Sequence, residues 1–226
     1  IYKLLIALKA RCAIVISPHP TAIRSISQTV ELLNQAAVDA GAPTDAISCM
    51  TKVSLEGTQA LMQQREIAVI LATGGMGLVR AAYSAGKPAY GVGPGNAPAY
   101  IERSAAITKA VSDIIAGKTF DNGLLCSSEN SVVVDRDISE TVRSQFAEQG
   151  GFFLNKEETE TLSRGLITPE RLPNPNLVGR SAIDIAQHCG ITVPSDTRVL
   201  LAPLTGVGRD YPLSIEKLCP VLSFYT

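Results

Sequence analysis

The stretch from Ile67 to Val92, IAVILATGGMGLVRAAYSAGKPAYGV, decides the fold. Its first five residues, Ile67–Leu71, form a continuous apolar run that is typical of a strand buried on both faces. The run enters a glycine turn, Thr73-Gly74-Gly75, and the turn opens a helix that is predicted to end at Ala85. A second apolar run, Pro88–Val92, follows. Because parallel strands are joined by a crossover that is usually a helix, this order predicts a parallel βαβ unit.

The same alternation extends upstream of this unit. Strands are predicted over 13–16 and 46–50, and helices over 21–40 and 55–64, with Gly41 closing the first helix. Continuous apolar strands that alternate with amphipathic helices predict a parallel sheet covered on both faces. The fold class is therefore α/β.

The glycine-rich segment 91–96, GVGPGN, is the candidate domain boundary, so we expect one domain over 1–94 and a second over 95–226. In the second, Asp137 and Glu140 have the spacing of a capping box at the start of a helix. The helices predicted there cover 107–117, 137–149, 156–164 and 181–189, and the strands cover 131–134, 198–202 and 221–225.

Composition excludes several classes of protein. Of the 226 residues, 46% are apolar and only 18% are charged, which excludes a disordered tail or a solvated coiled coil. The formal net charge of -1 gives no long-range attraction for nucleic acid or an anionic membrane surface. No apolar run approaches the ~20 residues that cross a bilayer, and the opening segment lacks the cleavage site of a signal peptide. A cytoplasmic protein that binds neither nucleic acid nor membrane is expected.

The cysteine pattern and the ends of the chain carry further information. The five cysteines are odd in number and unpaired in spacing, which argues against a zinc site, any other bound metal and a disulfide scaffold. We expect four of them to be core residues: Cys12, Cys49, Cys189 and Cys219. Because the chain begins with Ile1 rather than Met and stops inside an apolar run, we expect it to be a piece of a longer protein.

Local sequence leaves the candidate site residues with two interpretations each. The Thr73-Gly74-Gly75 turn presents backbone N–H groups and a positive helix end to a phosphate, but a tight turn without a ligand gives the same pattern. Cys126 lies among small polar residues, where a thiol can be exposed, although a lone cysteine is more often a core residue. His19 follows a strand, where it would contact a ligand or shape the loop. Glu216 is either a solvated loop acid or an acceptor for vicinal ribose hydroxyls.

Five stretches, in one order along nearly the whole chain, resemble the CoA-acylating branch of the aldehyde dehydrogenase superfamily, which includes acetaldehyde and propionaldehyde dehydrogenases. The resemblance implies a Rossmann-like NAD(P)-binding domain, partial here, over 1–94. It also implies a partial α/β catalytic domain with the nucleophilic cysteine over 95–226, and assembly as a homo-oligomer. The stretches are ALKARCAIVISPHPTA (7–22), VILATGGMGLVRAAYSAGKPAYGVGPGNAPAYI (69–101), KTFDNGLLCSSENSVVV (118–134), LVGRSAIDIAQHCGITVP (177–194) and EKLCPVLSFY (216–225).

The resemblance also implies roles for individual residues. NAD is the expected cofactor. NADP stays open, because Ser17 takes the place of the usual ribose-binding lysine and Pro20 that of the acid which selects against a 2′-phosphate. The second oxyanion donor of the superfamily, an asparagine, is expected upstream of Ile1. The implied site residues are Cys126 as nucleophile, Thr73, Gly74 and Gly75 over the pyrophosphate and nicotinamide, Ser17, Pro18 and His19 at the adenosine end, and Glu216 on the nicotinamide ribose.

One departure from the hydrolytic members of the superfamily indicates the reaction. They carry a general-base glutamate in a Glu-Leu-Gly-Gly-Lys motif, and aligning that motif on Ala97-Pro98 places Val92 at the glutamate. Since general-base catalysis typically contributes ~100–10,000-fold, a thioester on Cys126 should resist water and wait for a thiol such as CoA. The expected reaction is oxidation of a short aldehyde to acyl-CoA with hydride transfer to NAD(P).

The sequence is also compatible with three other functions. An acyl-phosphate reductase shares the fold and the cysteine, and an acylating sulfoacetaldehyde dehydrogenase differs only in its aldehyde. A non-catalytic nucleotide-binding or interaction module is the alternative of a different class. The cytoplasm is the expected compartment, either free or inside a bacterial microcompartment.

Overall fold

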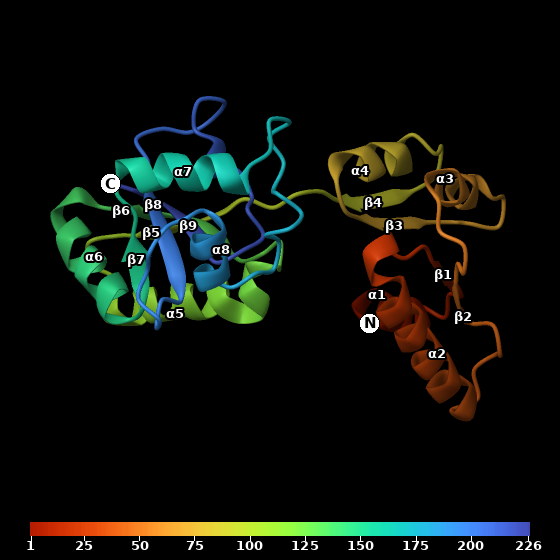
Figure 1. Cartoon of the computed structure of the whole chain (residues 1–226). Coiled ribbons are helices and arrows are strands. Elements are labelled where there is room, and N and C mark those ends of the chain that lie inside the picture. The colour runs from red at the N-terminus through yellow and green to blue at the C-terminus, as the bar shows by residue number, and fades with distance from the viewer. The chain divides into compact units, whose positions relative to one another are not determined.

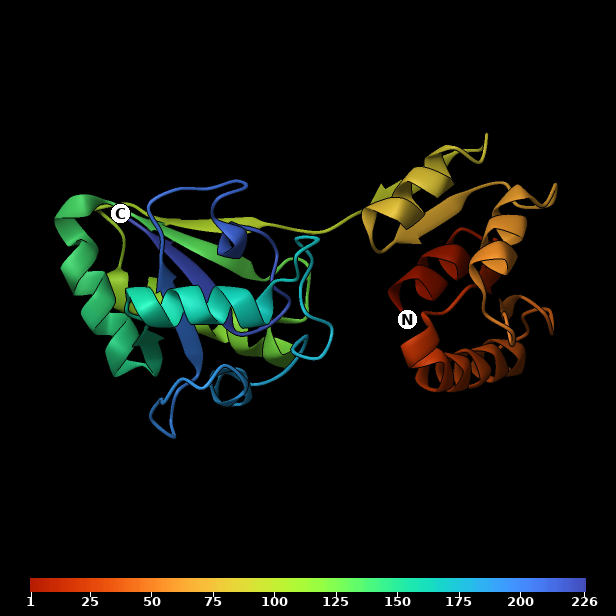
Figure 2. The same ribbon diagram turned by 45° about the horizontal axis from the view of Figure 1, so that its top comes forward.

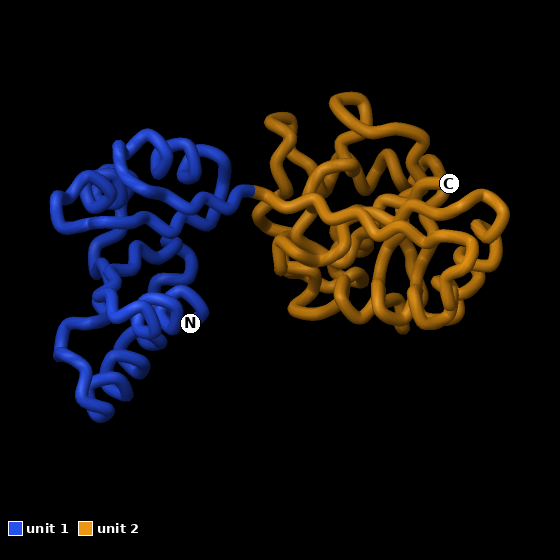
Figure 3. The backbone as a smooth tube through the Cα atoms, turned by 180° about the vertical axis from the view of Figure 1, so that it is seen from behind, with its two compact units in different colours: residues 1–93 blue, residues 94–226 orange.

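The computed structural model describes residues 1–226, which form two compact units, 1–93 and 94–226 (Figure 3). The division falls inside the glycine-rich segment 91–96. No helix has both the length and the apolar character needed to cross a membrane.

The first unit contains two separate parallel strand pairs, β1 with β2 and β3 with β4 (Figure 1). Helices follow the strands in the predicted alternation. The elements are α1 (Tyr2–Lys9), β1 (Ile14–Ile16), η1 (Pro20–Ala22), α2 (Ile23–Asp39), β2 (Ile47–Cys49), α3 (Leu55–Gln63), β3 (Ile70–Thr73), α4 (Met76–Tyr83) and β4 (Ala89–Val92).

Two details of the first unit differ from the sequence-based expectations. The strand predicted over 67–71 begins only at Ile70 and extends to Thr73, because its bounds follow the pairing of Ile70 with Ala89 and of Thr73 with Val92. The predicted continuous sheet is divided into two pairs. Apolar patterning identifies strands, but it does not determine which strand edges meet.

The second unit is built on one five-stranded parallel sheet in the order β5-β6-β9-β8-β7. The fold class is α/β, as predicted, and the large doubly covered sheet lies here rather than in the first unit. The elements are β5 (Ala97–Ile101), α5 (Ile107–Thr119), η2 (Phe120–Gly123), β6 (Glu129–Val134), η3 (Arg136–Ile138), α6 (Ser139–Glu148), β7 (Gly151–Phe153), α7 (Lys156–Leu166), α8 (Ala182–His188), β8 (Val199–Pro203), η4 (Pro212–Ser214) and β9 (Val221–Tyr225).

Helices cover both faces of this sheet (Figures 1 and 2). Successive residues of β8 alternate between two cores: Leu200 belongs to the cluster that holds α7 and α8, and Leu201 to the cluster that holds α5 and α6. A central strand that is apolar on both sides is what two helix layers require. Phe146 of α6 is fully buried and meets Phe224 of β9 edge to face, with ring centroids 6.5 Å apart.

The predicted capping box at Asp137 and Glu140 is wrong. Asp137 lies in η3, and α6 begins after Ile138 with no side-chain cap, because the 3-10 turn leads directly into the helix. The capping box lies instead at α7, where the Asn155 side chain accepts the Glu158 N–H and the Glu158 carboxylate accepts the Asn155 N–H.

Candidate active site

Cys126 is an exposed thiol on the turn between η2 and β6. The chain reaches it through three successive left-handed residues, Asp121, Asn122 and Gly123. A side chain at Gly123 would bring its Cβ within 2.8 Å of the Cys219 carbonyl oxygen, so this position requires glycine for space as well as for its positive φ. The Asn122 side chain donates a hydrogen bond to the Gly179 carbonyl at 3.0 Å and anchors the turn.

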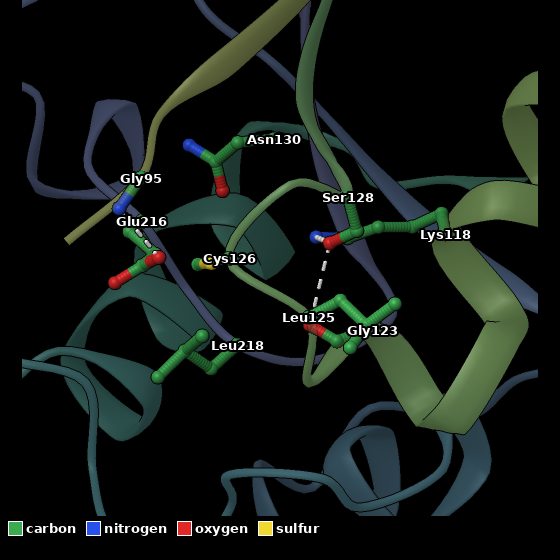
Figure 4. A pocket seen from close by; sticks show the side chains of 9 residues that line it. All are labelled: Gly95, Lys118, Gly123, Leu125, Cys126, Ser128, Asn130, Glu216 and Leu218. Atoms are coloured by element: carbon green, nitrogen blue, oxygen red, sulfur yellow. Dashed lines mark hydrogen bonds between the residues drawn. The ribbon is translucent and has the colours of Figure 1, made fainter. Parts of the chain in front are cut away.

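Gly95 connects the Cys126 turn to Glu216. Its N–H donates to Oε1 of Glu216 at 2.7 Å. A Cβ built on Gly95 would lie only 2.0 Å from the carbonyl oxygen of Cys126, which shows how closely the two backbones approach. The Glu216 carboxylate and the Cys126 backbone, far apart in sequence, thus both lie beside Gly95 (Figure 4).

The Glu216 carboxylate is half-buried, and burial raises its pKa. The Gly95 N–H and the positive charge of Lys118 act in the opposite direction and favour the ionised form. Lys118, on the last turn of α5, is itself buried, and burial lowers its pKa. The nine residues that line the narrow pocket around Cys126 are Gly95, Lys118, Gly123, Leu125, Cys126, Ser128, Asn130, Glu216 and Leu218.

Beside this pocket lies a partly buried polar network that sequence reasoning missed. Asn130 of β6 donates to the Asn96 side chain at 2.6 Å and to the Ile215 carbonyl at 2.7 Å, and Asn96 donates to the Ser214 carbonyl at 3.0 Å. Lys217 is completely buried beside them. The sequence signal for this network was that its polar residues lie in or next to apolar strands. Polar residues at strand ends are also typical of loops, so this signal does not by itself identify a network.

The glycine turn lies in the first unit at the carboxyl end of β3, where Thr73, Gly74 and Gly75 are all exposed. Gly75 is the N-cap of α4, and no side chain caps this helix. A Cβ on Gly75 would meet no atom within 4 Å, so space is open above the turn. The uncapped N–H groups and the positive helix end fit the diphosphate of a dinucleotide.

The segment Ser17-Pro18-His19 follows β1 in the same unit. The Ser17 hydroxyl hydrogen-bonds the Thr58 hydroxyl at 2.7 Å, and Pro18 is buried. The His19 Nδ1 atom accepts the Thr21 N–H and caps η1, so the loop-shaping interpretation of His19 describes what it does here. Both this segment and the glycine turn lie at carboxyl ends of parallel strands, the usual place for ligands in α/β folds.

The remaining cysteines differ in their exposure to solvent. Cys12 is exposed in the turn after α1, so its prediction as a core residue is wrong, because α1 and the turn that ends it were not anticipated. Cys49 and Cys189 are half-buried and Cys219 is buried. Burial raises the pKa of Cys219 to about 11 and keeps it in the thiol form at neutral pH.

The chain is similar to known proteins along its whole length. The profile of the aldehyde dehydrogenase family matches residues 1–151. The chain is 46% identical over 225 residues to the aldehyde-alcohol dehydrogenase of Clostridium acetobutylicum, a match that covers all of this chain and 26% of that protein.

Solved structures agree with this match. An acetylating aldehyde dehydrogenase from Geobacillus thermoglucosidasius is 49% identical with a TM-score of 0.96, covering 99% of this chain and 49% of that one. A propionaldehyde dehydrogenase from Rhodopseudomonas palustris, with bound CoA and an acylated cysteine, is 30% identical with a TM-score of 0.86, covering 94% of this chain and 48% of that one. The chain therefore spans a quarter to a half of the length of these relatives. The fold, the family profile and these likenesses together show that the chain belongs to the aldehyde dehydrogenase family.

Proposed function

We propose that this chain carries the cofactor-binding and thiol-bearing parts of a CoA-acylating aldehyde dehydrogenase, which oxidises a short aldehyde to acyl-CoA. The observation that carries the proposal is the exposed Cys126 thiol in one pocket with Glu216, in a chain that closely resembles an acetylating aldehyde dehydrogenase. In this proposal residues 1–94 belong to the cofactor domain and residues 95–226 to the catalytic domain.

Cys126 is the proposed nucleophile. Its thiolate sulfur adds to the aldehyde carbon, and the carbonyl electron pair moves to oxygen to form a hemithioacetal oxyanion. The Cys126 N–H is the proposed donor to that oxyanion. When bound, NAD supplies the acceptor for the hydride that leaves the former aldehyde carbon. The product on the protein is a thioester of Cys126.

CoA is the proposed acceptor of the acyl group because position 92 carries no base. Valine cannot remove a proton from water, so the thioester meets no activated water from this position. The CoA thiolate attacks the thioester carbonyl, the bond to Cys126 breaks, and the Cys126 thiolate is restored. One aldehyde, one NAD⁺ and one CoA thiol thus give one acyl-CoA, one NADH and one proton.

The remaining site residues have proposed roles in cofactor binding. Glu216 accepts the hydroxyls of the nicotinamide ribose, which an ionised carboxylate can do through both oxygens. The Thr73-Gly74-Gly75 turn binds the diphosphate, and the segment 17–19 lies along the adenosine end. NAD is the proposed cofactor, in a cytoplasmic homo-oligomer that is free or enclosed in a microcompartment.

The test uses the complete enzyme with acetaldehyde and follows the absorbance of NADH, with and without CoA and with NADP in place of NAD. CoA-dependent NADH formation with acetyl-CoA as product is expected, and Cys126→Ala should abolish it while cofactor binding remains. Free acetate formed without CoA would refute the acylating function. Turnover of sulfoacetaldehyde alone would assign the other aldehyde, and cofactor binding without turnover of any aldehyde would indicate a non-catalytic nucleotide-binding module.

A further inference from the structure

Lys217 is a buried cation that the proposed reaction does not use. It stands directly after Glu216, its side chain has no exposed surface, and no carboxylate lies within salt-bridge distance of it. Burial, together with the positive charge of Lys118, lowers its pKa well below the ordinary value, whereas the acceptor oxygens around Nζ favour the protonated form. Burying a lysine without a counter-ion costs free energy of folding, so a fully buried lysine at this position points to a specific role.

Four oxygen atoms surround the Lys217 ammonium, and all of them act as acceptors. Nζ lies 2.7 Å from the Leu213 carbonyl oxygen, 3.0 Å from that of Asn130 and 3.3 Å from that of Ile215. The fourth is the Ser223 hydroxyl at 3.1 Å, whose own hydrogen is donated to the Leu213 carbonyl. A protonated amine offers three N–H donors to these oxygens, whereas a neutral amine offers two.

These contacts join the segment before Glu216 to the sheet. Asn130 lies on β6 and Ser223 on the neighbouring strand β9, while Leu213 and Ile215 belong to the segment that leads to the carboxylate. Lys217 therefore ties both ends of this segment to two central strands. The only other side-chain donors to its carbonyls are Ser223, Asn96 and Asn130.

Lys217 is connected to the Cys126 pocket through its neighbour Glu216. The carboxylate accepts one hydrogen bond, from the backbone N–H of Gly95, and Gly95 lies close to the Cys126 carbonyl. Because this single contact at 2.7 Å does not fix the Glu216 backbone, the backbone must be held from the other side. Lys217 is the adjacent residue and makes four contacts that do so.

We propose that Lys217 is a positioning residue, whose buried ammonium holds the segment 213–217 so that the Glu216 carboxylate faces the bound nicotinamide ribose. This inference rests on the proposed function, because it takes Glu216 as the ribose acceptor. Lys217 is fully buried and none of its four hydrogen bonds is to Cys126, so in this proposal it acts through Glu216.

A double-mutant cycle tests this role in the complete enzyme, with NADH affinity measured by its fluorescence. Lys217→Met removes the charge at similar length and should raise the Kd for NADH roughly tenfold, the loss expected when a hydrogen bond to a charged group is misplaced. In a Glu216→Gln background the same change should raise the Kd less than about twofold, because coupled residues are non-additive. Ser223→Ala removes one of the four acceptors and should give a smaller shift in the same direction, which keeps the test decisive if Lys217→Met does not fold.

Phe146→Leu is the matched control, because it loosens a fully buried position in the core on the opposite face of the sheet. It should lower the melting temperature without changing the Kd for NADH. If Lys217→Met or Ser223→Ala lowers the melting temperature but leaves the Kd unchanged, or raises the Kd equally in both Glu216 backgrounds, the positioning role is wrong. Absence of CoA-dependent turnover in the unmodified enzyme would refute the proposed function instead, while the binding cycle would still decide the role of Lys217. Absence of binding of both NADH and NADPH would refute both.

Discussion

At the residue scale, the environment of each thiol separates Cys126 from the other cysteines. Cys126 is exposed on a turn held by Asn122, whereas Cys219 is buried with a pKa of about 11. Exposure alone does not assign a nucleophile, because Cys12 is exposed as well. What distinguishes Cys126 is the carboxylate of Glu216 and the glycines that share its pocket.

This contrast predicts a labelling pattern. A brief treatment with iodoacetamide should alkylate Cys126 and Cys12 and leave Cys219 unmodified, as read by peptide mass spectrometry, because only exposed thiols that can ionise react. NAD and aldehyde together should protect Cys126 but not Cys12. A Cys12→Ser variant provides the control with one exposed thiol. Labelling of Cys126 no faster than Cys219, or equal protection of both exposed thiols, would contradict the assignment.

Glu216 predicts a pH dependence of cofactor binding. Its pKa is raised by burial, so it takes up a proton at higher pH than an ordinary glutamate, whose pKa is about 4.3. The buried charge therefore costs stability above the folded pKa, and this cost disappears as the pH falls. Since the carboxylate is the proposed ribose acceptor, the Kd for NADH should rise, roughly tenfold, as the pH falls through the folded pKa.

The measurement is the Kd for NADH by fluorescence across the acidic range. Glu216→Gln should bind NADH weakly and should lack this rise in Kd at low pH, which is the acidic limb of the binding profile. Asp113→Asn changes an exposed carboxylate of α5 to an amide and should keep the limb unchanged. A limb that persists in Glu216→Gln would assign the titration to another group.

At the element scale, the approach of two backbones builds the site. The segment that enters β5 passes so close to the Cys126 turn that Gly95 has no room for a methyl group. This constraint is steric, since Gly95 does not have a positive φ. The same segment delivers the N–H that holds Glu216, so one glycine contacts both the Cys126 backbone and the Glu216 carboxylate.

Gly95→Ala should therefore reduce kcat by roughly 10–100-fold, because its Cβ displaces the Cys126 turn and small misplacements at a reacting centre are costly. Overpacking should also lower the free energy of unfolding by about 1–3 kcal/mol. Gly57→Ala in α3 is the control, since the added Cβ would meet only side-chain atoms, Met50 Cε and the capping Ser54 Oγ at 3.2 Å each, and Gly57 is not part of the Cys126 pocket. Full activity of Gly95→Ala in the complete enzyme would show that the turn can shift without consequence.

At the scale of the whole molecule, the two units contribute different chemistry to the proposed reaction. The first unit carries the glycine turn and Val92, which is half exposed at the carboxyl end of β4. The second carries Cys126 and Glu216 around one pocket. In the proposed reaction, the choice between water and CoA as acyl acceptor depends on a residue of the first unit, and the thioester forms on a residue of the second.

Val92→Glu should consequently raise the ratio of free acid to acyl-CoA, because it restores a carboxylate at the position of the general base in hydrolytic members. The full contribution of a well-placed base, ~100–10,000-fold, is an upper limit for this gain. Val92→Gln has the same length without a base and should leave the ratio unchanged. Product analysis at limiting CoA measures the ratio. An unaltered ratio in Val92→Glu would show that the Val92 alignment is wrong or that a base needs further support.

The sequence by itself determined the α/β class, most helices and strands, and the candidates Cys126, Glu216 and the glycine turn. Periodicity and turn residues are local, and the motifs kept their order along the chain. Only the tertiary structure decided that the large sheet lies in residues 94–226 and that β9 runs between β6 and β8. It also decided that Gly95 donates to Glu216 and that Asn130 and Lys217 bind the backbone of the segment before it. The physical reason is that strand pairing and the partners of a buried polar group depend on contacts between residues far apart in sequence. Local patterns constrain such contacts only weakly.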